Sequence, residues 1–166
     1  MTLPLFGEES TAEISPCGLY RYTLRRVWDR GKPLLVCCLL NPSTADAKID
    51  DRTVKLLVQW ARMLGYGGLL LVNLFAFRST DPGALKTAAD PVGALNDSRI
   101  LESVQLAGGH MLCAWGVGGA LRGRAQHVTA MLRAVGVELY QIPCERHDGP
   151  CHPLHHSVRG QLERVL

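Results

Sequence analysis

The sequence predicts an α/β fold of three layers, α/β/α, with a central, mainly parallel four-stranded sheet and an additional N-terminal strand or hairpin. Two observations predict this: short apolar runs alternate with segments of helical periodicity, and polar or glycine-rich turns follow the apolar runs. The chain has 166 residues, 47% of them hydrophobic, which suffices for one core but not for two ordinary domains. We therefore expect a single domain over residues 1–166, with residues 1–16 as a loosely ordered segment.

The first half of the chain contains two apolar runs separated by a helical segment. Residues 18–29 alternate in polarity and end in a turn signal, which predicts a strand or hairpin. Residues 33–40 form an unbroken apolar run that stops at Asn41, the pattern of a strand buried on both faces. Residues 51–64 place apolar side chains at helical spacing, and residues 69–75 form the second buried strand.

The second half repeats the same alternation of helix and strand. The expected elements are, in order, a helix capped by Asn96 or Asp97 that runs to about Leu106, a strand over 110–115 that ends in a glycine turn, a helix over 121–135, a strand over 138–142 and a helical segment over 158–165.

Charge and hydropathy set limits on location and partners. The formal net charge of +3 is compatible with nucleic acid without requiring it. No segment approaches the roughly 20 apolar residues of a membrane span. The N-terminal segment carries Glu8, Glu9 and Glu13 and lacks the basic and then apolar order of a secretory signal. We expect a cytoplasmic monomer with no membrane partner.

The six cysteines argue against a disulfide framework, because a reducing compartment keeps thiols free. Cys37 and Cys38 lie inside an apolar strand, so we interpret the cysteines as core residues. A second group, Cys144, His147, Cys151 and His152, has ligand types that zinc binds but lacks paired Cys-x-x-Cys spacing. We expect no metal and no cofactor, and this loop is the alternative metal site.

Polar residues follow the predicted strands where a ligand site is expected, because open α/β sheets bind ligands beyond the carboxyl ends of their strands. Asn41-Pro42-Ser43-Thr44 follows one strand, and His152-Pro153-Leu154 lies near the C-terminus. Each also has an ordinary interpretation, since Asn before Pro is a common turn residue. Asp50-Asp51 either caps the following helix or supplies an alternative catalytic carboxylate.

Several motifs together resemble a bacterial family known as domain of unknown function 1643. They are Asn41-Pro42-Ser43-Thr44-Ala45-Asp46, Asp50-Asp51, Gly65-Tyr66-Gly67, Asn73-Leu74-Phe75-Ala76-Phe77-Arg78, Asp81-Pro82, Asn96-Asp97, Ala114-Trp115-Gly116 and His152-Pro153-Leu154.

The order of four of these motifs also resembles the uracil-DNA glycosylase superfamily. In that superfamily a Gly-x-(Asp/Asn)-Pro turn, a Leu-Leu-Asn-like segment, an apolar strand ending in Trp-Gly or Leu-Gly, and His-Pro-Ser follow one another. The corresponding segments here are Leu39-Leu40-Asn41-Pro42, Leu71-Val72-Asn73, Ala114-Trp115-Gly116 and His152-Pro153-Leu154. The chain departs from the pattern at the Gly of the first motif and the Ser of the last, and no aromatic residue follows the first Pro.

This resemblance implies a uracil-DNA-glycosylase-like fold and assigns roles to individual residues. Asn41 and His152 become the catalytic pair, which positions water or stabilises the sugar cation and hydrogen-bonds the departing base. The remaining expected roles are base binding by Asn73, Phe75 and Ser43, a wedge at Leu154, and DNA contacts at Gly116 and Arg78. Some glycosylase relatives carry an iron–sulfur cluster, but Cys17, Cys37, Cys38 and Cys113 do not reproduce its layout.

The functional hypothesis is a monofunctional DNA glycosylase that acts in DNA repair or phage defence. It would hydrolyse the bond to a flipped-out uracil or to a modified, bulky pyrimidine, since small residues replace the aromatic wall after the first Pro. Two alternatives stay open. One is a hydrolase of free nucleotides or nucleosides, and the other is a non-catalytic nucleic-acid binder in which phosphates contact Arg122, Arg124, Arg133 and Arg159.

Overall fold

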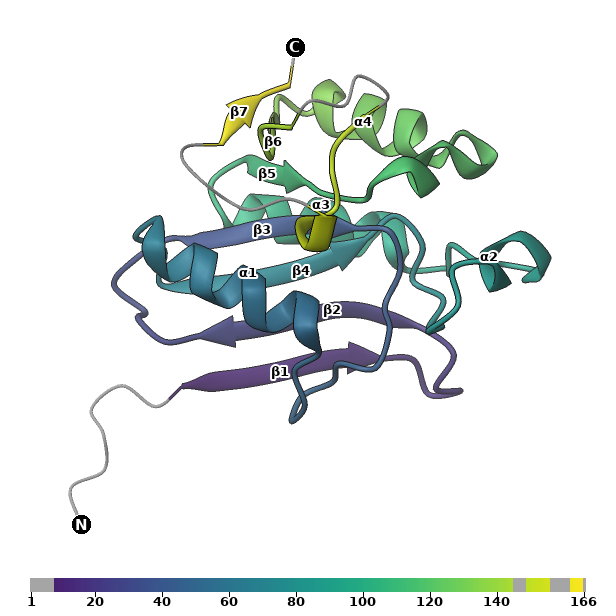
Figure 1. The fold of residues 1–166 in the computed structure, drawn as a ribbon, viewed down its shortest axis with the longest axis horizontal. Helices are drawn as coiled ribbons and strands as arrows, with labels where there is room; N and C mark the ends of the chain where they lie inside the picture. The colour runs from purple at the N-terminus through teal and green to yellow at the C-terminus, as the bar shows by residue number, and fades with distance from the viewer. Residues whose placement is uncertain (1–7, 145–148, 156–161, 166) are drawn as a thin grey trace.

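The computed structural model describes residues 8–144, 149–155 and 162–165. Within these ranges seven strands form one mixed sheet in the order β1-β2-β4-β3-β5-β6-β7 (Figure 1). β3 pairs in parallel with β4 on one side and with β5 on the other, and β5 pairs in parallel with β6. These four strands are β3 (Leu34–Leu39), β4 (Gly68–Asn73), β5 (His110–Cys113) and β6 (Glu138–Gln141).

The outer strands are antiparallel to their neighbours. They are β1 (Glu9–Ile14), β2 (Arg21–Val27) and β7 (Glu163–Arg164). β2 matches the N-terminal strand or hairpin expected over residues 18–29, and β1 and β7 widen the sheet beyond the expected strands. The α/β class is confirmed, but two local predictions were wrong. Residues 9–14 are an edge strand rather than a loose segment, and residues 163–164 are a strand rather than a helix. The rest of the expected C-terminal helix lies largely outside the described residues.

Helices cover both faces of the sheet. The α-helices in the described ranges are α1 (Arg52–Met63), α2 (Ala84–Thr87), α3 (Asn96–Leu106) and α4 (Arg124–Ala134), and the 3-10 helices are η1 (Val117–Gly123) and η2 (Pro153–His155). α1 lies on one face, and α3 and α4 lie on the other (Figure 1). None of the helices described is long and apolar enough to cross a membrane.

The buried strand β3 contributes side chains to two hydrophobic cores, because successive side chains of a strand point to opposite faces. Leu35 and Cys37 pack in the core under α1, together with Trp60. Val36 and Cys38 pack in the core under α3 and α4. An unbroken apolar sequence is therefore required here, as expected for a strand covered on both sides.

Asp51 caps α1, whereas the predicted cap of α3 was wrong. The Asp51 side chain accepts a hydrogen bond from the Val54 N–H at 2.9 Å. At α3 the cap position is Leu95, and the buried Asn96 amide donates instead to the carbonyls of Asn73 and Leu74, at 2.9 and 3.0 Å. Asn96 serves these carbonyls at the end of β4, which are shielded from water and need partners.

A second buried donor serves the same strand end. Arg124 is 5% exposed, and its Nε donates to the Leu74 carbonyl at 2.6 Å. Its guanidinium also pairs with Asp97, which in addition contacts His127. Partial burial opposes ionisation of Asp97, but hydrogen bonds from Arg124 and His127 outweigh it, so the pKa of this carboxyl lies below its ordinary value.

We expect Asp97 to make the stability of the protein sensitive to acid. Because its pKa is lower in the folded state than the unfolded value of about 3.9, its contribution is present above that pH and is lost as pH falls through the folded value. The carboxylate is 41% exposed, so the effect should stay below about 1 kcal/mol. Urea denaturation at about pH 6 and about pH 3 measures how much free energy of unfolding the protein loses in acid. We expect this loss to be smaller in Asp97→Asn than in wild type. Equal losses would contradict the assignment.

Candidate functional site

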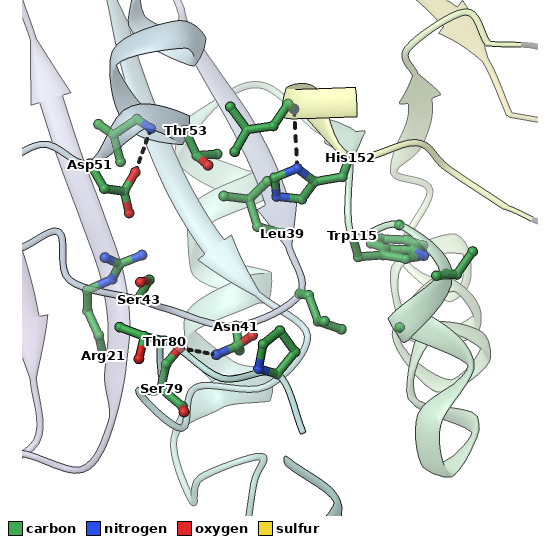
Figure 2. Close-up of a pocket in the computed structure, with 17 residues that line it drawn as sticks. Arg21, Leu39, Asn41, Ser43, Asp51, Thr53, Ser79, Thr80, Trp115 and His152 are labelled. Atoms are coloured by element: carbon green, nitrogen blue, oxygen red, sulfur yellow. Dashed lines mark hydrogen bonds between the residues drawn. The ribbon is translucent and has the colours of Figure 1, made fainter. Parts of the chain in front are cut away.

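A cavity of about 530 Å³ opens at the carboxyl end of β3, within the range that accommodates small-molecule ligands. Its walls come from the loop after β3, the N-terminus of α1, the loop after β4, the glycine turn after β5 and the segment around η2 (Figure 2). Segments far apart in the sequence meet here because β3 lies between β4 and β5 in the sheet.

The two polar turns singled out in the sequence meet at this cavity. Asn41 and Ser43 line it from the first turn, and His152 and Leu154 line it from the second (Figure 2). Gly116, from the turn after β5, lines the same cavity. The expectation that these five residues share one site is therefore matched by their placement.

Three other predicted site residues do not line the cavity. Asn73 and Phe75 are fully buried, and Phe75 packs in the core on the α3 and α4 side of the sheet. Arg78 donates from Nη1 to the Gly18 carbonyl at 3.2 Å and does not contribute to the wall. Phe75 cannot stack on a ligand in this cavity, because the sheet separates it from the α1 side.

The Asn41 amide has a fixed orientation. Its Nδ2 donates to the Pro42 carbonyl at 3.1 Å and to the Ser79 carbonyl at 3.0 Å. Both partners are acceptors, so the nitrogen must face them and Oδ1 is left as a hydrogen-bond acceptor. The same bonds tie the loop after β3 to the loop after β4.

His152 is held in a defined tautomer by its own loop. Its Nδ1 accepts a hydrogen bond from the Leu154 N–H at 3.2 Å, so a neutral ring carries its proton on Nε2. Gly116, in the turn after β5, has φ +70°, a left-handed conformation that favours glycine. The space itself would accept a side chain, because a Cβ added there would make an ordinary contact 3.5 Å from the His152 Cβ.

Arg21 is a cavity residue that the sequence did not indicate. It is 2% exposed, donates from Nη1 to the Ala45 carbonyl at 2.7 Å, and leaves its buried Nε without a partner. Burial lowers the pKa of this guanidinium to about 10, and the Asp51 carboxylate provides the strongest opposing effect. The Arg21 head group lies between Asp51 and Ser43 (Figure 2).

A β-bulge explains why Arg21 escaped prediction. Strict alternation places Arg21 on the same face as Thr23 and Arg25, which lie against α3. In the β1–β2 register, Glu13 pairs with Thr23 but Ile14 pairs with Arg21, so β2 contains one extra residue. Such a bulge re-aims the next side chain, here to the α1 side and into the cavity.

Asp51 also lines the cavity, between the start of α1 and the Arg21 side chain. Its Oδ1 is bound by the Val54 N–H at the start of α1, and its carboxylate faces Arg21 (Figure 2). The sequence predicted either a helix cap or a catalytic carboxylate at Asp50-Asp51. In the structure Asp51 is the N-cap of α1, and Asp50 forms an ion pair with Arg26 at 2.7 Å.

The cysteine assignments need two corrections, a disulfide and an exposed thiol. Cys144 and Cys151 form a disulfide, with their Cα atoms 6.6 Å apart, although no disulfide was expected. Cys37, Cys38 and Cys113 are buried as expected, whereas Cys17 is exposed. His147 of the alternative metal site lies outside the described residues. Among the residues that are described, no group of three metal-ligating side chains comes together.

Comparison with known proteins gives one match. The family described as "Protein of unknown function (DUF1643)" matches residues 21–154, a span that contains every residue lining the cavity. No curated protein and no solved structure matches. Nothing in these comparisons links the chain to the uracil-DNA glycosylases.

Two buried asparagines meet where β4 ends, Asn73 on the strand itself and Asn96 at the start of α3. Substitution by Leu should change the free energy of unfolding in opposite directions at these two positions. Both amide atoms of Asn73 are buried without a hydrogen-bond partner, a cost of about 1–3 kcal/mol that Asn73→Leu removes at similar volume. Asn96→Leu instead deprives the buried carbonyls of Asn73 and Leu74 of their donor. We expect Asn73→Leu to raise and Asn96→Leu to lower the free energy of unfolding, each by about 1–2 kcal/mol.

Urea denaturation of the two variants checks this prediction, with unchanged m-values as evidence that the folded and unfolded states keep their compactness. A loss of stability in Asn73→Leu comparable to that in Asn96→Leu would show that the Asn73 amide is well accommodated.

Proposed function

The chain belongs to the DUF1643 family of proteins of unknown function, and from its cavity we propose that it is a monofunctional DNA glycosylase. It would hydrolyse the N-glycosidic bond of a flipped-out uracil or modified, bulky pyrimidine and leave an abasic site. The observation that carries the proposal is the convergence of Asn41 and His152 on one cavity from turns far apart in the sequence. DNA is then the partner, and no cofactor takes part.

The geometry of these two residues suits the reaction. Breaking the bond between sugar and base builds positive charge on the sugar and negative charge on the base. The Asn41 Oδ1 accepts hydrogen bonds and can hold water or face the sugar cation. The Nε2–H of neutral His152 can donate to an oxygen of the departing base. Both interactions strengthen as charge develops, so they stabilise the transition state more than the substrate.

The arrangement of the sheet supports the same proposal. Ligands of open α/β sheets bind beyond the carboxyl ends of the parallel strands, and the cavity lies at the carboxyl ends of β3 and β5. The order of the four motifs along the chain resembles that of the uracil-DNA glycosylases. The first three motifs lie in or directly after the parallel strands β3, β4 and β5, and the fourth lies at η2.

The proposed base reader, Asn73, is fully buried beside a residue of the cavity wall. It pairs in register with Leu39, so both side chains face the same side of the sheet, and Leu39 lines the cavity. The unpartnered amide of Asn73 has the donor and acceptor that a pyrimidine edge needs. In this proposal a bound base displaces the neighbouring wall and reaches Asn73. Phe75 takes no part, because it packs on the opposite face.

The remaining roles follow from position around the opening. Leu154 is 37% exposed and borders the cavity next to His152, which suits a side chain that fills the space left by a flipped base. Gly116 offers backbone for a close approach of DNA, and Ser43 faces the cavity. A volume of about 530 Å³ exceeds the need of one pyrimidine ring and leaves space for a substituent.

Asn41→Ala and His152→Ala should each lower base release by about 10²–10³-fold, the usual loss when one transition-state hydrogen bond is removed. Oligonucleotides with uracil or modified pyrimidines are incubated with the protein, and abasic sites are then cleaved with alkali. His127→Ala is the matched control, because His127 is an exposed histidine that pairs with Asp97 away from the cavity. This control should retain wild-type activity.

Two outcomes would replace the proposal by its alternatives. Preference for free nucleotides or nucleosides over oligonucleotides would indicate a hydrolase of monomers. Binding that weakens steeply with salt, without release of any base, would indicate a non-catalytic nucleic-acid binder. The arginines expected for that binder are only partly suitable. Arg124 is buried, Arg122 donates to the carbonyls of Lys86 and Ala88, and Arg159 lies outside the described residues.

A further inference from the structure

We propose that Asp51 is a further catalytic residue, whose free carboxylate oxygen accepts the proton of the attacking water while Asn41 only orients that water. The inference rests on the proposed glycosidic hydrolysis and names the group that this hydrolysis still lacks. The Asn41 amide is not basic enough to remove a proton, and a positioned general base contributes about 10²–10⁴-fold to such a reaction.

Asp51 is the only carboxylate among the described residues that line the cavity. Its Oδ1 accepts the Val54 N–H at 2.9 Å, which fixes the side chain and leaves Oδ2 as the second acceptor. Asp51 and His152 lie on opposite sides of the cavity (Figure 2). Glycoside hydrolases that use a direct water attack have the same arrangement, with base and acid on opposite sides of the scissile bond and space between them for water.

Two sources of positive charge lie beside the Asp51 carboxylate. The N-terminus of α1 carries partial positive charge, which stabilises an anion at the cap position. The buried guanidinium of Arg21 faces the carboxylate, although within the described residues the two groups are not close enough to form an ion pair. Arg21 therefore attracts the carboxylate from the side of its second oxygen. It acts as a positioning residue.

The proposed step balances without a cofactor. The bond between the sugar C1′ and the base nitrogen breaks, and its electron pair stays on the base, where the Nε2–H of His152 stabilises it. The oxygen of water forms the new bond to C1′. The proton that this water loses passes to Oδ2 of Asp51 and then to solvent, and the base takes up a proton from solvent. The products are a free base and an abasic sugar.

Asp51→Asn separates catalysis from folding, because Asn caps helices as well as Asp does. We expect this variant to keep the wild-type melting temperature and its affinity for the substrate oligonucleotide, but to lose about 10²–10⁴-fold in the single-turnover rate of base release. Asp51→Ser keeps a cap as well and serves as the second variant should Asp51→Asn not fold. Asp50→Asn is the matched control, since Asp50 pairs with Arg26 outside the cavity, and it should retain the wild-type rate.

Arg21 is tested by two substitutions that differ in charge. Arg21→Met should lower the rate of base release and leave oligonucleotide binding unchanged, whereas Arg21→Lys should restore most of the rate. A purely structural role of Arg21, through its hydrogen bond to the Ala45 carbonyl, would instead lower the melting temperature together with the rate.

The outcomes distinguish this inference from the proposed function. Wild-type base release with an equally active, folded Asp51→Asn variant would overturn the role of Asp51 and leave the glycosylase proposal in place. Failure of the wild type to release any base from any oligonucleotide would overturn both. A large rate loss in Asp51→Asn, with binding and melting temperature unchanged, supports the inference.

Discussion

The rest of the structure depends on the burial of β3 between two parallel neighbours. β3 pairs with β4 and β5 and contributes side chains to the cores on both faces. Its residues must therefore be apolar, because a polar side chain would be buried on either face. At Asn41 the chain leaves the buried sheet. This first polar side chain after β3 lies at the cavity that the loops after β4 and β5 also line. The cavity is a consequence of this strand order, because parallel neighbours bring their carboxyl ends to one edge.

Polar groups at the end of β4 show how stability and function compete at this edge. The carbonyls of Asn73 and Leu74 have buried donors in Asn96 and Arg124, which satisfy the backbone where the strand ends. The Asn73 side chain has no such partner. A folded protein rarely keeps a buried amide unsatisfied without a reason, and proximity to the wall residue Leu39 offers one. In the proposed function, this cost keeps an amide available beside the cavity wall.

Local patterns in the sequence predicted the parts of the fold that depend on local physics. The strand β3 and the helix α1 follow directly from apolar runs and helical spacing. The edge strand β1 was missed because its polar sequence forms a strand only by pairing with β2. Arg21 was missed because a bulge reverses the face it occupies, and the disulfide was missed because it depends on how one loop folds back. Motif order along the chain, rather than alternation, pointed to Asn41 and His152, which line the same cavity; their catalytic role stays a prediction.

The hydrogen bonds of Asn41 also explain why a carboxylate has to lie elsewhere in the cavity. The side chain at this position donates to the carbonyls of Pro42 and Ser79, which join two loops of the site. An ionised carboxylate has no hydrogen to donate and would face two oxygen atoms across the same distances, so Asp at this position would loosen the loops that form the wall. Asn41 thus joins the two loops through its nitrogen, and in the proposed function its oxygen faces the ligand. A cap residue such as Asp51 has the opposite constraint, because the helix N-terminus requires an acceptor there and tolerates full negative charge.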